Sequence, residues 1–166
     1  MIYPSERVGI GGGRLKLSTK GRYGLRAIVD LAVHQSQGAV SISSIAARQS
    51  LSENYLEQLM SRLKKAELVC SVRGAQGGYV LAKAPEEISV GDILRALEGD
   101  LTPVACTAIH GVAGNCQSEH TCVTKYVWQQ IDDSINQTVN RIFLDELVAE
   151  SREKQIDPKE KQNCPI

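Results

Sequence analysis

Apolar side chains recur at helical spacing along the first part of the chain. The first such stretch predicts a helix that begins at Ser18 and ends near Gly38. Val40 and Ile42 then alternate with other residues, which predicts a short strand or turn rather than a continued helix. The apolar positions of the predicted helix are Leu25, Ile28, Val29 and Ala32.

Two more helices with a tight turn between them are predicted next. Ser43 is placed to cap a short helix whose inner side carries Ile45 and Ala46, and Ser52 is placed to cap a longer one. The longer helix covers about residues 53–66, and the turn before it takes residues 50–52. Its apolar residues lie at i, i+3, i+4 and i+7 and predict one buried face: Leu56, Leu59, Met60 and Leu63.

A β-hairpin and a further helix complete this part of the chain. Residues 69–72 and 79–81 predict two short strands, and the sequence RGAQGG between them supplies the glycines of the turn. Ser89 can cap the next helix, whose apolar stripe is Val90, Ile93, Leu94 and Leu97. Helix, turn, helix and hairpin in this order predict a winged helix-turn-helix, a DNA-binding domain over residues 15–99.

The rest of the chain predicts a loop, a long helix and a tail. Residues 100–122 show little apolar periodicity and form a loop. Residues 123–149 hold a long amphipathic helix, from about residue 123 to residue 141, and a last turn of helix at residues 144–148. Residues 1–14 predict a flexible extension, and residues 150–166 predict a disordered tail. The predicted fold class is therefore mainly α, with a small β-hairpin wing and a long helix whose stripe joins two copies as a homodimer.

The formal net charge of zero hides a division between the two halves of the chain. Residues 14–83 hold 11 Lys and Arg against 4 Asp and Glu, whereas residues 84–166 hold 7 against 14. A basic first half matches the charge of a nucleic-acid-binding surface. No apolar run approaches the roughly 18 residues of a membrane helix, and no signal peptide is evident, so we expect a cytoplasmic protein without a membrane partner.

Polar side chains on the helix over residues 53–66 are suited to reading bases. Asn and Gln can bond adenine at two atoms, and Glu can accept from cytosine. Basic residues flank this helix and predict phosphate contacts, and Arg73 at the hairpin tip predicts a contact in the minor groove. The plainer alternative is a solvated helix face in a protein-interaction module. The predicted DNA contacts are Ser52, Asn54, Tyr55, Glu57, Gln58, Arg62, Arg73, Lys20 and Arg22.

Three cysteines in the predicted loop have the spacing C-x9-C-x5-C. Three thiolates on one loop can bind one metal centre, and soft sulfur ligands favour iron–sulfur clusters and Zn. The alternatives are three incidental thiols or a thiol switch that forms a disulfide. Cys70, in a predicted strand, is expected to be a small buried hydrophobe. The candidate metal ligands in the loop are Cys106, Cys116 and Cys122.

Four segments together resemble one family of bacterial regulators, the IscR-type iron–sulfur cluster regulators, which also includes CymR and NsrR. The segments are KLSTKGRYGLRA (16–27), LSENYLEQLMSRLKKAELV (51–69), VRGAQGGYVL (72–81) and ISVGDILRALEG (88–99). The resemblance covers about residues 16–148. It implies a homodimer that binds operator DNA and controls iron–sulfur biogenesis genes, with Arg73 as the family's wing arginine.

The same resemblance implies a [2Fe–2S] cluster on the three cysteines, with operator choice controlled by its presence. The sequence departs from the family pattern in two places. Lys125 stands where the family has a His ligand, so the fourth ligand must come from elsewhere. His120 is preferred because it flanks Cys122, and the alternatives are His110, Glu119, a group from the N-terminal domain or an exogenous ligand. Asn54 replaces a Ser, which predicts a different base preference.

A CymR-like regulator without a cluster, controlled by a partner protein or by thiol oxidation, is the alternative. An enzyme is not expected, and neither is a small-molecule substrate. The chain shows no nucleophile and base pairing, no Gly-rich phosphate loop and no paired carboxylates. A redox or metal carrier whose winged helix binds protein is a third possibility, and salt-sensitive DNA binding would exclude it.

Overall fold

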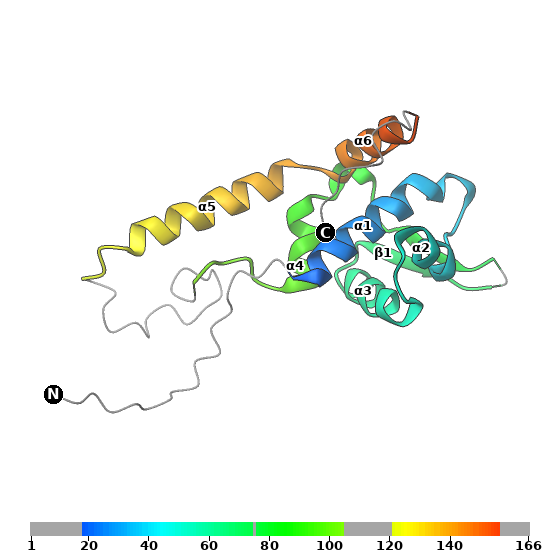
Figure 1. The fold of residues 1–166 in the computed structure, drawn as a ribbon, viewed down its shortest axis with the longest axis horizontal. Helices are drawn as coiled ribbons and strands as arrows, with labels where there is room; N and C mark the ends of the chain where they lie inside the picture. The colour runs from blue at the N-terminus through cyan, green and yellow to red at the C-terminus, as the bar shows by residue number, and fades with distance from the viewer. Residues whose placement is uncertain (1–17, 75, 105–120, 157–166) are drawn as a thin grey trace, which may run out of the picture.

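The structure, a computed structural model, describes residues 18–74, 76–104 and 121–156 (Figure 1). These residues are mainly helical, with one two-stranded antiparallel sheet, so the predicted fold class is confirmed. The elements are α1 (Thr19–His34), η1 (Gln35–Gln37), α2 (Ile42–Gln49), α3 (Glu53–Lys65), β1 (Val69–Val72), β2 (Gly78–Leu81), η2 (Pro85–Glu87), α4 (Val90–Glu98), α5 (Lys125–Arg141) and α6 (Leu144–Ile156).

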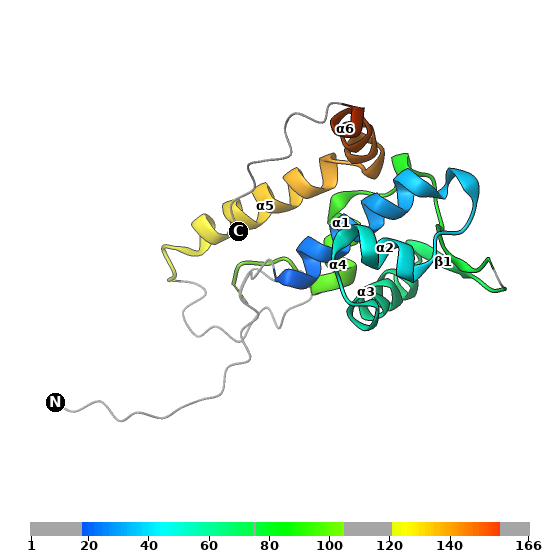
Figure 2. The ribbon, with the colours of Figure 1, turned by 45° about the vertical axis from the view of Figure 1, so that its right-hand side comes forward.

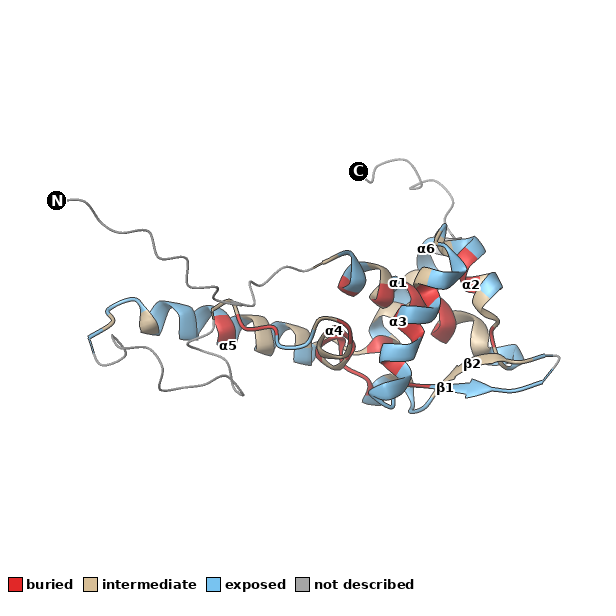
Figure 3. Cartoon of the chain, turned by 90° about the horizontal axis from the view of Figure 1, so that it is seen from below, coloured by how far each residue is buried: buried red, intermediate tan, exposed pale blue. Residues whose placement is uncertain are grey.

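One apolar core lies where α1, α2, α3 and α4 meet, and Figure 3 shows the buried residues gathered there. The four apolar residues predicted for the inner face of α3 are all buried. In α1 the buried stripe includes Ala27, Ile28 and Leu31. Leu25 and Val29, which were predicted for the same stripe, are half buried. Leu144 and Val148 of α6 close the core from the far side of α1.

The helix-turn-helix is defined by its caps. Ser52 caps α3 as predicted, because its hydroxyl accepts a hydrogen bond from the amide of Tyr55 at 3.3 Å. The predicted cap of α2 is wrong: Ser41 caps this helix, and its hydroxyl accepts from the amide of Ser44 at 3.1 Å. Ser50 ends α2 in the left-handed conformation, with φ of 55°, and turns the chain into α3.

The wing is the hairpin of β1 and β2, in which Val69 pairs with Leu81 and Val72 with Gly78. Val40, expected in a short strand or turn, forms an isolated antiparallel bridge with Tyr79, whereas Ile42 already belongs to α2. Gly78 permits this bridge, because a β-carbon there would collide with the Val40 backbone. Cys70, expected to be buried, is exposed on β1.

The second part of the molecule is built on α4. Its cap Ser89 is the predicted one, and its residues Val90 and Leu94 form a small second core with Ile135 and Val139 of α5. From there α5 projects away from the winged domain, as Figures 1 and 2 show from two directions. Most of the projecting half of α5 is exposed (Figure 3).

Two predicted boundaries differ from the structure. The long helix begins at Lys125 rather than near residue 123, and α6 runs on to Ile156, beyond residue 150 where we expected a tail. The rest of that tail, the extension at residues 1–14 and most of the cysteine loop lie outside the described residues. No helix that the structure describes is long and apolar enough to cross a bilayer.

Candidate nucleic-acid interface

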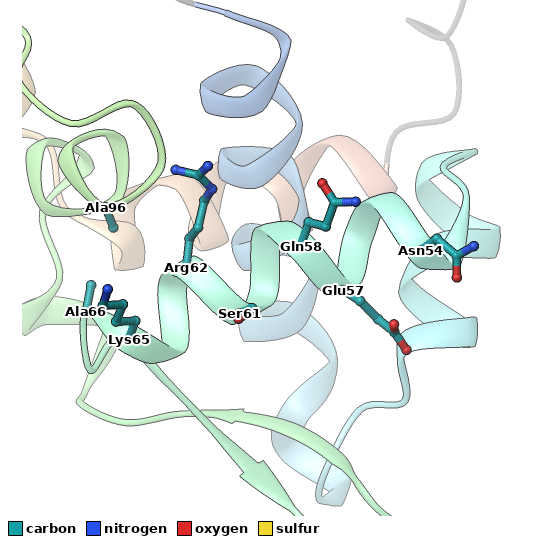
Figure 4. A pocket seen from close by; sticks show the side chains of 8 residues that line it. All are labelled: Asn54, Glu57, Gln58, Ser61, Arg62, Lys65, Ala66 and Ala96. Carbon is teal, nitrogen blue, oxygen red and sulfur yellow. The ribbon is translucent and has the colours of Figure 1, made fainter.

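The outer face of α3 borders a broad open hollow of about 1010 Å³ between α3 and α4 (Figure 4). Gln58 and Arg62 point to the same side of α3, and Asn54 and Glu57 lie nearer its N-terminal end (Figure 4). Ser61 also faces the hollow, although the sequence analysis did not select it; its spacing from Glu57 and Gln58 would have identified it. The lining residues are Asn54, Glu57, Gln58, Ser61, Arg62, Lys65, Ala66 and Ala96.

The hydroxyls of two predicted base contacts, Ser52 and Tyr55, are not free to reach a base. Ser52 is exposed, but its hydroxyl already caps α3. Tyr55 is half buried and packs edge-on against Tyr23 of α1, with 6.2 Å between ring centroids. The Tyr55 hydroxyl is buried and has no hydrogen-bond partner among the described residues. In this arrangement the ring of Tyr55 fixes α3 on α1, and its hydroxyl is not open to a base.

Exposed basic side chains lie at the start of α1 and on α3. Lys20 and Arg22 lie exposed in the first turn of α1, and Arg22 stacks over the ring of Tyr23 at 4.8 Å. The Nη1 atom of Arg62 donates to the carbonyl of Leu97 in α4 at 3.4 Å. Since these guanidinium groups are held in place yet remain exposed, they are arranged to meet an anionic backbone.

The wing is tied to α3 and carries its own basic residue. Lys64 donates to the hydroxyl of Ser71 in β1 at 2.6 Å. Arg73 is exposed beside Gly74, whose φ of 123° requires glycine at the turn. The wing therefore presents a guanidinium at its tip, on a hairpin whose base is fixed to the candidate recognition helix.

A buried carboxylate sets the angle between α1 and α2, and sequence reasoning missed it. Asp30 is only 6% exposed. It accepts hydrogen bonds from Arg48 at 2.6 to 3.1 Å and from Gln49 at 3.0 Å. The hydrogen bond to Asp30 raises the pKa of Arg48 against the opposing effect of partial burial. Because Arg48 and Gln49 end α2, this pair holds the first helix of the helix-turn-helix on α1.

Of the four predicted metal ligands, only Cys122 lies within the described residues; Cys106, Cys116 and His120 lie outside them. Cys122 is half-exposed, and its sulfur lies 3.4 Å from the hydroxyl of Thr124. Hydrogen bonds from Thr124, and secondarily the amide and charge of Lys125, lower the pKa of the Cys122 thiol. Within the described ranges no three His, Cys, Asp or Glu side chains form a metal site. A lowered pKa favours the thiolate, which is the form of cysteine that binds a soft metal.

The known proteins to which this chain is similar are transcriptional regulators. A family model described as the iron-dependent transcriptional regulator Rrf2 matches residues 17–150. The HTH-type transcriptional regulator IscR of Pectobacterium carotovorum is 39% identical over 152 residues, which are 92% of this chain and 89% of the relative. IscR of Aliivibrio salmonicida is 38% identical over 146 residues, 88% of this chain and 84% of the relative.

Solved structures agree with these sequences. The structure of T. potens IscR matches with a TM-score of 0.69 and 46% identity, over 86% of this chain and 92% of that chain. CymR, the global cysteine regulator of B. subtilis, matches with a TM-score of 0.66 and 41% identity, over 81% of this chain and 97% of that chain. The predicted class, a DNA-binding transcriptional regulator rather than an enzyme, is confirmed. The chain belongs to the Rrf2 family of iron-dependent transcriptional regulators.

Proposed function

We propose that α3 enters the major groove of an operator and that its exposed N-terminal half reads bases there. Asn54, Glu57 and Gln58 supply the donors and acceptors that base edges require. The observation that carries this proposal is the hollow along α3, which these residues share with Arg62 and Lys65. A groove with base-reading groups at one end and phosphate-binding groups at the other fits duplex DNA.

Phosphate contacts come from three parts of the molecule. Lys20 and Arg22 stand at the start of α1, Arg62 stands on α3, and Arg73 stands on the wing. A guanidinium on a hairpin tip suits the narrow minor groove beside the major-groove site. Each phosphate that the protein neutralises contributes about 0.9 to the slope of log affinity on log salt concentration.

The active species in this proposal is a homodimer joined through α5. The first turns of α5 expose large apolar groups to solvent: Tyr126 is 63% exposed, and Val127, Trp128 and Ile131 are between 37% and 38% exposed. Val123, just before the helix, is 82% exposed. Such a contiguous apolar face on a projecting helix is typical of a subunit interface. To read successive turns of the duplex, a two-fold dimer must hold its two copies of α3 about 34 Å apart.

We further propose that Cys106, Cys116 and Cys122 hold a [2Fe–2S] cluster, and that the protein represses iron–sulfur biogenesis genes in the cytoplasm. The lowered pKa of the Cys122 thiol and the IscR relatives support this assignment. A bound cluster would act as a ligand whose binding changes the preference of the dimer among operators. Lysine is a poor ligand for iron, so Lys125 is not the fourth ligand, and His120 is our candidate because it flanks Cys122.

The cluster proposal is tested by purifying the protein without oxygen and measuring its visible absorption with iron and sulfide per chain. We expect charge-transfer absorption and iron and sulfide in equal amounts. The triple variant Cys106→Ala, Cys116→Ala and Cys122→Ala should lose both and keep its helical circular dichroism. Cys70→Ala, outside the loop, is the matched control and should keep the cluster. A triple variant that still carries the absorption would refute the ligand assignment.

A CymR-like regulator without a cluster is the second candidate, because the structure of CymR also matches this chain, with a lower TM-score and a lower identity than that of T. potens IscR. In that case an anaerobic preparation stays colourless after iron and sulfide are supplied, and operator binding responds instead to a partner protein or a thiol oxidant. The same purified protein thus distinguishes the two.

A further inference from the structure

The carboxylate of Glu98, the last residue of α4, caps the start of α1 from 80 residues away. It accepts hydrogen bonds from the amide of Ser18 at 3.0 Å and the amide of Gly21 at 2.7 Å. The Ser18 hydroxyl lies 2.7 and 2.8 Å from its two oxygens. The amides of a first helical turn have no partner within the helix and carry a partial positive charge. A carboxylate is therefore the group that holds this turn most strongly.

The same turn of α4 also contacts the candidate recognition helix. The carbonyl of Leu97 accepts the hydrogen bond from Arg62 of α3. The Leu97 side chain is fully buried and fills the space over Gly24 of α1, where a β-carbon would collide with it. Two consecutive residues of α4 thus fix α1 and α3 relative to one another.

We infer that Glu98 is a positioning residue for DNA binding. It fixes the first turn of α1, which carries Lys20 and Arg22, in register with Arg62 on α3, so that the three cations meet phosphates together. This inference rests on the proposed function, since it requires that α1 and α3 face DNA. No group of Glu98 itself needs to touch DNA, because its oxygens are engaged by Ser18 and Gly21.

The direction in which one substitution changes DNA affinity separates this positioning role from charge repulsion. Glu98→Gln removes a negative charge beside a DNA-binding surface, and charge repulsion alone predicts equal or tighter binding. A positioning role predicts the opposite, about tenfold weaker binding, because a neutral amide holds the α1 amides less strongly. The matched control is Glu87→Gln: Glu87 also accepts a backbone hydrogen bond, from Ala84 at 3.2 Å, but it lies in η2.

A second variant moves the carboxylate without removing its charge. An alanine β-carbon at Gly21 would lie 2.7 Å from Oε1 of Glu98 and 3.2 Å from Cδ2 of Leu94. Both atoms end flexible side chains, so the carboxylate must swing away while α1 gains a better helix former. We expect Gly21→Ala to keep the melting temperature within a few degrees of the wild type and to bind DNA several-fold more weakly. If Glu98→Gln fails to fold, this variant decides the question.

The experiment uses fluorescence anisotropy with a duplex selected from a random pool by the full-length wild-type protein, over a series of salt concentrations. We expect both variants to weaken binding and to lower the salt slope by about 0.9 for each phosphate that the protein no longer neutralises, with Glu87→Gln unchanged. Wild-type affinity and slope in both variants would overturn the inference. Failure of the wild type to select any duplex would instead overturn the proposed function.

Discussion

Arg48→Met should be far more destabilising than an ordinary substitution on the protein surface. The methionine keeps the apolar stem of Arg48 but removes its bidentate hydrogen bonds to Asp30, which are 2.6 to 3.1 Å long. The side chain of Asp30 is 4% exposed, so its carboxylate stays buried with Gln49 as its remaining hydrogen-bond donor and with Nδ1 of His34 3.8 Å from its Oδ2. A buried charge left without its partner is costly, whereas an exposed pair contributes little.

The magnitude follows from these two limits. Removing one partner of a fully buried pair costs about 3–5 kcal/mol. The Arg48 side chain is 34% exposed and therefore partly screened, and Gln49 remains, so we expect the free energy of unfolding to fall by about 2 kcal/mol. For a chain of this size that loss lowers the melting temperature by about 4–8 °C.

Denaturant unfolding at a fixed protein concentration measures this loss, with the double variant Asp30→Asn and Arg48→Met as its control. The double variant also removes the charge that Arg48→Met strands, so we expect it to be more stable than Arg48→Met alone. A change below about 0.5 kcal/mol in Arg48→Met would show that the pair does not hold α2 on α1. A double variant less stable than Arg48→Met would refute the buried-charge reasoning itself.

Three further predictions concern single side chains. Ser52→Ala removes the cap of α3 and should lower the free energy of unfolding by about 1 kcal/mol in denaturant titrations; no loss would mean that the 3.3 Å cap bond contributes nothing. Arg73→Ala should reduce the salt slope of operator binding by about 0.9 and leave the melting temperature unchanged, and an unaltered slope would place the wing away from DNA. Burial, with the charges of Asp100 and Asp133 adding to it, raises the pKa of Asp132 above 3.8, so the folded protein binds this proton more readily than the unfolded chain. The contribution of Asp132 to the stability of the folded protein should therefore rise as the pH falls from the raised pKa toward 3.8. Asp132→Asn should be more stable than the wild type at neutral pH and should lose this pH dependence. Melting temperatures that follow the same pH profile in both proteins would contradict the raised pKa of Asp132.

Local signals in the sequence predicted the elements of the winged domain well. Ser52 and Ser89 stand directly before amphipathic stretches, and both are caps in the structure. The prediction that Ser43 caps α2 was wrong, because Ser41 and Ser44 are equally good caps by residue type and the helix begins at Ile42. The prediction that Cys70 is buried was wrong, because Val69 is the only buried residue of β1. A strand residue of the wing need not face the core.

Contacts between distant residues could not be predicted from the sequence. Asp30 and Arg48 are 18 residues apart, and Ser18 and Glu98 are 80 apart, so neither pair has a local pattern. Tyr55 looked like an exposed polar residue of the recognition helix, but an aromatic ring can bury itself against Tyr23 while its helix stays exposed. Burial of a polar-tipped aromatic depends on its neighbour in space, which periodicity along one helix does not reveal.

The most direct test of cluster control is the affinity of one preparation for two duplexes, one selected with the cluster bound and one selected without it, before and after the cluster is removed. Fluorescence anisotropy without oxygen gives all four values. Cluster control predicts that the ratio of the two affinities changes by at least about fivefold on removal, and that the variant Cys106→Ala, Cys116→Ala and Cys122→Ala binds both duplexes like the cluster-free protein. A ratio that is the same with and without the cluster would contradict control of operator choice by an iron–sulfur centre.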